Sequence, residues 1–176
     1  MPVLVIGAGP AGLAIAACLK RRQVPFDLVD RRGAVGGAWG HIYAGTTLMS
    51  PARYTSLPGL RLRHPAEYIT APEYHAYLQA YAAYHELKVR RAEVTQVTPQ
   101  HRSLTVIFRE ELQPRVYEAV VVATGMFDFP AWPEIPGLTS DPASGLIALH
   151  ARDWRGPAPF QGKRLLIIGG ASGAIE

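Results

Sequence analysis

The amino-acid sequence predicts an α/β fold, in which a parallel sheet carries an N-terminal βαβ unit and a β-meander lies against that sheet. Residues 3–6 (VLVI) and 119–123 (AVVVA) are short unbroken apolar runs, as is typical of strands buried on both faces of a parallel sheet. A glycine-rich turn and a helical pattern follow the first run directly. Residues 89–117 contain further strand-like runs separated by turns, which favours a meander.

The βαβ unit occupies the first 30 residues. Residues 3–6 form its first strand, and residues 11–22 have the apolar spacing of an amphipathic helix. Pro25 separates this helix from a second apolar run, residues 26–29, which ends in Asp30. A strand, a glycine turn, a helix and a second strand in this order predict two parallel neighbours.

A long segment without periodicity and a second helix come next. Residues 31–70 are rich in Gly, Pro, Arg and Tyr, and a stretch of that length without periodicity predicts a loop that is either functional or disordered. Thr70 and Glu73 then have the spacing of a capping box, which predicts a helix start. The helix carries a stripe that predicts a core-facing surface, formed by Tyr74, Tyr77, Leu78, Tyr81 and His85.

The last third of the chain contains the remaining strand-like runs. Residues 89–97, 104–108 and 116–124 predict a β-meander whose last strand returns to the buried parallel sheet. Residues 126–160 are rich in proline and predict a loop. Residues 163–168 (KRLLII) predict one more buried strand.

Composition excludes several classes of protein. The 18 Lys and Arg residues against 14 Asp and Glu give a net charge of +4, but they are scattered, so we expect no nucleic-acid binding. No apolar run approaches the ~20 residues that cross a bilayer, so we expect no membrane span. One cysteine excludes a disulfide scaffold and an internal redox pair. These features together predict a cytoplasmic protein, and they leave its oligomeric state open.

Residues 7–12 (GAGPAG) form a complete G-x-G-x-x-G between a strand and a helix, which is the dinucleotide-binding pattern of the Rossmann fold. Gly7 permits the tight turn, Gly9 lets a pyrophosphate approach the backbone, and Gly12 lets the helix pack closely on the strand. The helix N-terminus offers N–H groups and a partial positive charge to phosphates. The other motif positions at this helix start are Pro10 and Ala11.

An acidic residue stands where this pattern requires one. Asp30 follows Gly12 by 18 residues, at the end of the second strand, and such a carboxylate accepts hydrogen bonds from ribose hydroxyls. Arg31 and Arg32 come next, and they suit either the 2′-phosphate of NADP or a solvated loop. The unit therefore predicts a dinucleotide site without separating FAD from NAD(P).

Together with residues 36–39 (GGAW) and 123–125 (ATG), the glycine motif resembles flavin-containing monooxygenases and Baeyer–Villiger-type enzymes, which are flavoproteins with two nucleotide sites. Residues 56–59 (SLPG) and the helix around Tyr77 also resemble related bacterial flavoproteins. The resemblance implies a Rossmann-like FAD/NAD(P)-binding fold. It also implies an FAD-dependent, NADPH-using oxidoreductase of the monooxygenase type that acts on a small-molecule substrate.

The resemblance also implies which residues bind FAD. It places the glycine motif at the pyrophosphate and Asp30 at the adenosine ribose. The other implied contacts are Gly37 and Trp39 along the cofactor, Thr124 and Gly125 near the pyrophosphate, and Val94 at the adenine through its backbone. No residue is assigned as acid, base or nucleophile, and no cluster of His, Cys or carboxylates has the spacing of a metal site.

A second glycine-rich segment, residues 169–176 (GGASGAIE), resembles the NADPH motif of the same flavoproteins and implies contacts from Gly169 and Ser172. Ala171 stands at its middle glycine position. We expect residues 1–160 to be an FAD-binding domain and residues 161–176 to begin an NAD(P)-binding domain that is cut short. On this expectation the chain is the N-terminal portion of a longer enzyme and is not competent alone.

Two alternatives remain open. One is a reductase with a single Rossmann domain, in which Arg31 or Arg32 reads the 2′-phosphate of NADPH. The other is a nucleotide-binding fragment without turnover. His150 and Trp154 have the H-x-x-x-W spacing of a monooxygenase signature, but the preceding Phe is absent, so a loop histidine beside a packing tryptophan is an equal interpretation.

Overall fold

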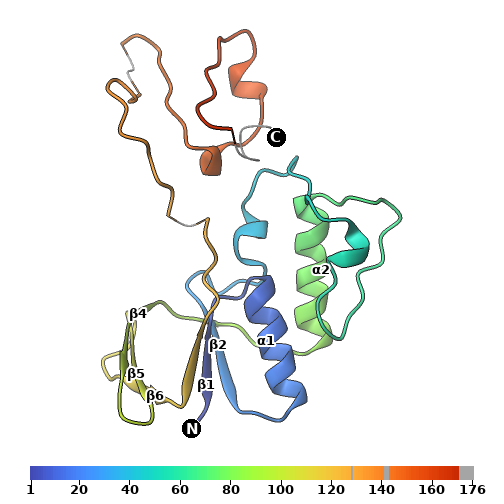
Figure 1. Cartoon of the computed structure of the whole chain (residues 1–176), viewed down its shortest axis with the longest axis vertical. Helices are drawn as coiled ribbons and strands as arrows, with labels where there is room; N and C mark the ends of the chain where they lie inside the picture. Colours follow the sequence, from blue (N-terminus) through green and yellow to red (C-terminus); the bar gives the residue numbers. More distant parts are fainter. Residues whose placement is uncertain (128, 141–142, 171–176) are drawn as a thin grey trace.

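The computed structural model describes residues 1–127, 129–140 and 143–170. Its centre is a parallel sheet of four strands in the order β3-β2-β1-β7. The strands are β1 (Val3–Ile6), β2 (Phe26–Asp30), β3 (Arg90–Arg91) and β7 (Ala119–Val122). Figure 1 shows the α-helices on one side of this sheet and an antiparallel sheet on the other. The predicted α/β class is therefore confirmed.

Both predicted helices are present: the second begins where predicted, and the first begins one residue earlier than predicted. Helix α1 (Pro10–Arg21) follows the glycine turn with proline in its first turn, and α2 (Ala71–Tyr84) begins after Thr70. The backbone N–H and the hydroxyl of Thr70 both donate to Glu73 Oε2, at 2.7 and 2.8 Å. Short 3-10 turns occupy Gly37–Gly40 (η1), Ala52–Tyr54 (η2), Ala151–Asp153 (η3) and Ala158–Phe160 (η4).

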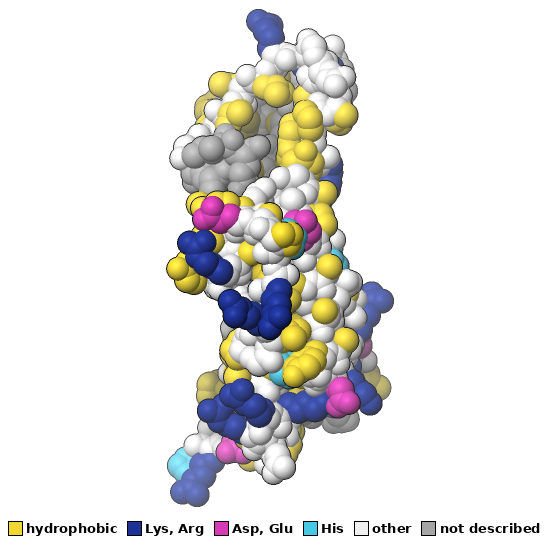
Figure 2. All heavy atoms as spheres, turned by 90° about the vertical axis from the view of Figure 1, so that its right-hand side faces the viewer, with side chains coloured by type: hydrophobic (Ala, Val, Ile, Leu, Met, Phe, Trp, Pro, Cys, Tyr) yellow, Lys and Arg dark blue, Asp and Glu magenta, His cyan; other side chains and the backbone are white. Residues whose placement is uncertain are grey.

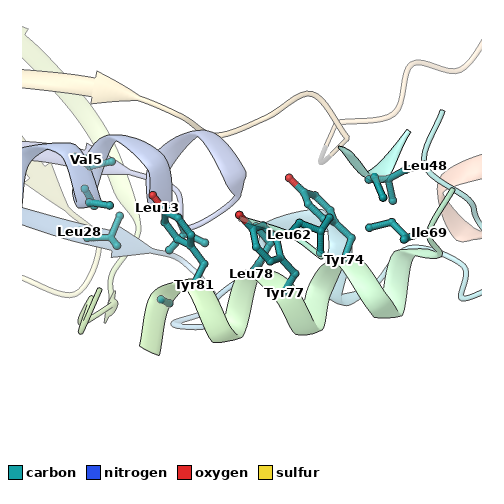
Figure 3. Packing of buried hydrophobic residues seen from close by; sticks show 14 residues of the cluster. Val5, Leu13, Leu28, Leu48, Leu62, Ile69, Tyr74, Tyr77, Leu78 and Tyr81 are labelled. Atoms are coloured by element: carbon teal, nitrogen blue, oxygen red, sulfur yellow. The ribbon is translucent and has the colours of Figure 1, made fainter. Parts of the chain in front are cut away.

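The larger core lies between the parallel sheet and the helices. Val5 of β1 and Leu28 of β2 face this side, together with Leu13 of α1. The predicted stripe of α2 supplies Tyr74, Tyr77, Leu78 and Tyr81, all of them buried, while His85 is only partly buried. Figure 3 shows the three tyrosine side chains extending from the same face of α2 into this core.

The smaller core lies on the opposite face of the same sheet. Leu4 of β1 and Val29 of β2 contact buried residues of the antiparallel sheet, chiefly Phe108 and Tyr117. That sheet has the order β4-β5-β6 and consists of β4 (Val94–Pro99), β5 (Leu104–Phe108) and β6 (Arg115–Tyr117). Because adjacent residues of β1 point into two different cores, the strand needs an unbroken apolar sequence.

The meander is confirmed, but two of the predicted runs each supply strands to both sheets. Within 89–97, Arg90 and Arg91 pair with β2, and the meander begins only at Val94. Within 116–124, Glu118 alone separates β6 from β7. Hydrophobic periodicity marks a residue as buried, but it does not specify which of two adjoining sheets buries it.

The predicted strand at residues 163–168 is wrong. These residues are exposed and form no strand, with Leu166 at 85% exposure. A strand needs a neighbour to pair its N–H and C=O groups, and the named strands in residues 1–127 pair only with one another. The described residues of 129–140 and 143–170, orange to red in Figure 1, extend away from the parallel sheet.

No helix among the described residues is long and apolar enough to cross a membrane. Within the same ranges, no group of three or more His, Cys, Asp or Glu is placed to hold a metal ion. On the face drawn in Figure 2, the Lys and Arg side chains occupy several separate places rather than one continuous patch.

Candidate dinucleotide site

The predicted site residues gather where three neighbouring strands of the parallel sheet end. Gly7 follows β1, Asp30 ends β2, and Thr124 comes two residues after β7. The Gly7 N–H donates to the carbonyl of Val29 at 2.7 Å, and the Ala123 N–H donates to that of Ile6 at 2.8 Å. Ligands of open α/β sheets bind at this carboxyl edge, so the topology supports a site here.

The three motif glycines have different surroundings. Gly7 has a φ of +105°, and a Cβ there would collide with the carbonyl of Ala123. A Cβ on Gly12 would collide with the carbonyl of Gly7. Around Gly9, by contrast, no protein atom lies within 4 Å of the place where a Cβ would stand. Gly7 and Gly12 are therefore required by the fold, whereas the absence of a side chain at Gly9 leaves an open approach to the backbone.

The N-terminus of α1 lies at this opening and suits an anion. Gly9 is its N-cap residue, so no side chain caps the first N–H groups, and the first turn holds no acidic residue. Pro10 at the helix start brings no N–H of its own. The remaining free N–H groups and the helix dipole favour a phosphate at this place, so these residues fit the pyrophosphate of a dinucleotide.

Asp30 joins the loops around the site. Asp30 is 8% exposed, and its carboxylate accepts from the N–H of Ala8 through Oδ2 at 3.1 Å and from that of Arg32 through Oδ1 at 2.8 Å. Its carbonyl accepts from the N–H of Ala92 at 3.1 Å, which places the start of the meander beside it. A carboxylate has about four acceptor positions, so two bonds leave capacity for ribose hydroxyls.

The turn η1 lies against the glycine loop. The Gly36 N–H donates to the carbonyl of Ala8 at 2.8 Å, and a Cβ on Gly37 would stand 3.1 Å from Cα of Gly9. Trp39 is partly buried, with its ring edge-on to that of Tyr74 at 5.0 Å between centroids. Burial raises the pKa of Tyr74 to about 12, so this ring stays neutral at physiological pH.

The other predicted residues on this side lie around the same edge. Thr124 lies against Gly7, and Gly125 has a φ of +73° with open space around it. Val94 begins β4, two residues after the contact between Ala92 and Asp30, and its side chain packs into the smaller core. The Arg31 guanidinium lies 5.9 Å from the ring centre of Phe129.

Of the two residues predicted to contact NADPH, only Gly169 lies within the described ranges. Gly169 is exposed, with no protein atom near the place of a Cβ, and Ser172 lies outside the described residues. His150 Nδ1 accepts from the N–H of Arg152 at 3.1 Å, and Trp154 stacks on Phe160 at 5.1 Å. These contacts match the interpretation of a loop histidine beside a packing tryptophan.

Sequence reasoning missed two contributors to this site. Ala8 acts through its backbone N–H and carbonyl, so its residue type carries no signal. His75, on α2, lies against η1, with Nε2 3.0 Å from the carbonyl of Val35. In the sequence, only its position next to Tyr74 of the buried stripe indicates that His75 lies near the core. That position does not indicate which residues its ring contacts.

Residues 4–176 match the sequence pattern of the family described as pyridine nucleotide-disulphide oxidoreductase. The probable indole-3-pyruvate monooxygenase YUCCA7 of Arabidopsis thaliana is 31% identical over 98% of this chain and 42% of its own length. A protein named uncharacterized oxidoreductase CzcO-like, from Geobacillus kaustophilus, is 34% identical over 98% of this chain and 49% of its own length. The chain thus spans about half the length of the curated relatives it matches.

Solved structures share the fold. A mutant flavin monooxygenase from Stenotrophomonas maltophilia superposes with a TM-score of 0.83 at 33% identity, over 98% of this chain and 52% of that one. OTEMO, in complex with FAD and NADP, gives a TM-score of 0.67 at 22% identity over 78% of this chain and 28% of its own, which shows the fold alone. Since the family pattern extends over nearly the whole sequence, the chain belongs to the pyridine nucleotide-disulphide oxidoreductase family.

Proposed function

We propose that this chain binds FAD and forms the flavin-binding portion of an NADPH-using oxidoreductase of the monooxygenase type. One observation carries the proposal: the uncapped N-terminus of α1 lies at the open space over Gly9, where the glycine loop, Asp30, η1 and Thr124 meet. The identity of 33% with a flavin monooxygenase over 98% of the chain supports FAD as the dinucleotide.

Each part of the site has a binding task in this proposal. The free N–H groups of α1 and its dipole stabilise the pyrophosphate charge, and Asp30 accepts the hydroxyls of the adenosine ribose. The turn η1, with Gly37 and Trp39, lies along the cofactor, and Thr124 and Gly125 lie on the pyrophosphate side. FAD, when bound, supplies the redox chemistry by accepting hydride from a reduced nicotinamide.

NADPH use and the domain boundary are also proposals. Residues 161–176 begin the NAD(P)-binding domain, with Gly169 and Ser172 as its nucleotide contacts, and residues 1–160 bind FAD. The chain spans about half of its relatives, and this supports a flavin-binding portion that needs further chain for turnover. The relatives carry different names, so the substrate is proposed only as a small molecule.

Titration of the purified chain with each nucleotide tests the proposal. We expect saturable FAD binding, measured by quenching of flavin fluorescence, and a rise in melting temperature with FAD that exceeds the rise with NADPH. A colourless protein that NADPH stabilises and FAD does not would favour the single-domain reductase, with Arg31 or Arg32 at the 2′-phosphate. Arg31→Ala and Arg32→Ala, compared at equal protein concentration, then show which arginine contacts the 2′-phosphate, because both variants lose the same charge.

A second measurement tests competence. With FAD supplied, we expect the 176-residue chain to bind flavin but to oxidise NADPH no faster than free FAD does. Sustained NADPH oxidation by the chain would contradict the proposal that it is only the flavin-binding portion. Because binding and turnover are measured separately, failure of one leaves the other interpretable.

A further inference from the structure

We infer that His75 is a positioning residue that holds η1 in place over the glycine loop and thereby sets the affinity of the site for its dinucleotide. This inference rests on the proposed function, since the dinucleotide is taken to be FAD. Nothing in the sequence motifs points to His75, which lies in the first half of α2 and is partly buried.

A hydrogen bond ties this side chain to the loop before η1. Nε2 of His75 lies 3.0 Å from the carbonyl oxygen of Val35, 40 residues earlier in the chain. A carbonyl only accepts, so the ring must donate, which requires the proton on Nε2. The bond therefore joins a helix to the segment that enters the site.

The imidazole also fills a notch made by two glycines. A Cβ on Gly36 would overlap Cδ2 of His75, and a Cβ on Gly40 would stand 3.3 Å from its Cε1 and Nε2. The ring thus lies close to the backbone just before η1 and at its last residue, and a side chain at Gly36 would leave it no room. This two-point contact defines where the whole turn lies.

The turn needs an external support of this kind. Gly36 and Gly37 have φ values of +110° and +58°, and glycine at such positions has many alternative conformations. The support itself is rigid, because the neighbouring Tyr74 is buried and its helix begins with a capping box. Tyr74 adds a second contact to the same turn through Trp39.

The contact continues into the dinucleotide site. Gly36, beside the His75 ring, donates its N–H to the carbonyl of Ala8 at 2.8 Å, and Gly37 approaches Cα of Gly9. Ala8 in turn donates to Asp30. If the ring is removed, η1 loses its fixed distance from the backbone that receives the pyrophosphate.

Two variants separate the hydrogen bond from simple filling of space. His75→Phe keeps an aromatic ring in the notch but cannot donate to Val35, whereas His75→Gln restores a donor. We expect His75→Phe to weaken FAD binding about tenfold, equal to about 1.4 kcal/mol, and His75→Gln to recover most of that loss. His101→Phe, at an exposed position in a turn of the meander, is the matched control and leaves affinity unchanged.

A readout without nucleotide keeps the inference independent of FAD. Amide hydrogen exchange of residues 36–42 in the free chain should become faster in His75→Phe, with the exchange of α1 unchanged. Gly40→Ala places a methyl group against the same imidazole ring from the side of η1, and it should also speed exchange and weaken FAD binding. This variant keeps the inference testable if His75→Phe fails to fold. Unchanged exchange and affinity in His75→Phe would overturn the inference.

The outcomes also separate this inference from the proposed function. If the wild-type chain binds no FAD but His75→Phe accelerates exchange in η1, the positioning contact stands and the choice of FAD fails. If the wild-type chain binds FAD and every variant matches it in affinity, FAD binding stands and the positioning role fails.

Discussion

Gly9 and Gly12 belong to one motif but have opposite surroundings, so substitution separates binding from folding. Because no protein atom lies near the place of a Cβ on Gly9, Gly9→Ala should change the free energy of unfolding by less than about 1 kcal/mol. The added methyl group stands where the pyrophosphate approaches, so FAD affinity should fall at least about tenfold, or about 1.4 kcal/mol. Urea denaturation and fluorescence titration measure the two effects.

Gly12→Ala is the matched comparison. Its methyl group would collide with the carbonyl of Gly7, so this variant should lose stability with or without nucleotide. Equal losses of stability in the two variants would contradict the assignment of Gly9 to binding and Gly12 to packing.

Asp30 has a structural task in addition to the proposed ribose contact. Removal of its carboxylate in Asp30→Ala leaves the N–H of Ala8 without its acceptor, and an unsatisfied buried donor costs about 1–3 kcal/mol. We therefore expect a lower urea midpoint for Asp30→Ala in the absence of any nucleotide. Stability equal to that of the wild-type chain, with affinity lost, would show that the carboxylate serves the nucleotide alone.

At the scale of single elements, the start of α2 can be tested through its capping box. Thr70→Ala removes the side-chain half of that box and should cost about 1 kcal/mol, measured by urea denaturation near neutral pH. Hydrogen bonds from the backbone and hydroxyl of Thr70 hold the pKa of Glu73 below its ordinary value of 4.5.

The lowered pKa fixes the pH dependence of that cap. The contribution of ionised Glu73 is fully present above pH 4.5 and is lost as the pH falls through the lower pKa of the folded state. The stability difference between the wild-type chain and Glu73→Gln should therefore shrink as the pH falls below 4.5. A difference that stays constant down to acid unfolding would contradict this role.

These elements show what local sequence can predict. The capping box and the tyrosine stripe of α2 depend on neighbours within the same helix, so spacing alone locates them. The assignment of strands to sheets depends on distant partners. Arg90 and Arg91 carry no apolar signal, yet they pair with β2, and Glu118 gives no sign that the chain passes there from one sheet to the other.

At the scale of the whole molecule, three buried tyrosines in the two cores make the free energy of unfolding depend on pH in the alkaline range. Burial raises the pKa of Tyr74, Tyr81 and Tyr117 to about 12, and a hydrogen bond from Tyr117 to Asp27 adds to the shift of Tyr117. An unfolded tyrosine ionises near pH 10. Their contribution is therefore full below pH 10 and is lost as the pH rises through 12.

The measurement is denaturation as a function of pH. The free energy of unfolding should fall steadily between pH 10 and pH 12, and Tyr117→Phe should make that slope smaller. Tyr84→Phe, at an exposed position on α2, is the control and should leave the slope unchanged. A slope that Tyr117→Phe does not reduce would contradict the assignment of that residue.

The proposed domain boundary predicts that the end of the chain adds little to the folded unit. Residues 163–168 are exposed, and the backbone N–H of Lys163 donates to the carbonyl of the nearby Phe160 at 3.0 Å. A chain that ends at residue 160 should therefore keep its melting temperature within about 2 °C, since less than about 0.5 kcal/mol is lost. A larger drop, measured by circular dichroism, would show that residues 161–176 belong to the first domain.

The site was more predictable than the full course of the chain. The glycine motif and Asp30 follow strand ends, so their meeting at one edge of the sheet follows from parallel order. Ala8 contributes through its backbone, and His75 contributes by contacting a loop that is distant in the sequence. Neither kind of contact leaves a pattern in the residue types. For residues 163–168, apolar composition indicated a strand but could not supply the neighbouring strands that a sheet requires.

The position of β1 between β2 and β7 has a consequence for synthesis on the ribosome. One neighbour, Phe26–Asp30, is synthesised soon after β1. The other, Ala119–Val122, is synthesised more than a hundred residues after the end of β1. Until then one edge of an entirely apolar strand has unpaired N–H and C=O groups, which is the kind of surface that associates with other chains. The nascent protein therefore passes through a long interval in which its glycine loop is already made but this edge of β1 is still uncovered.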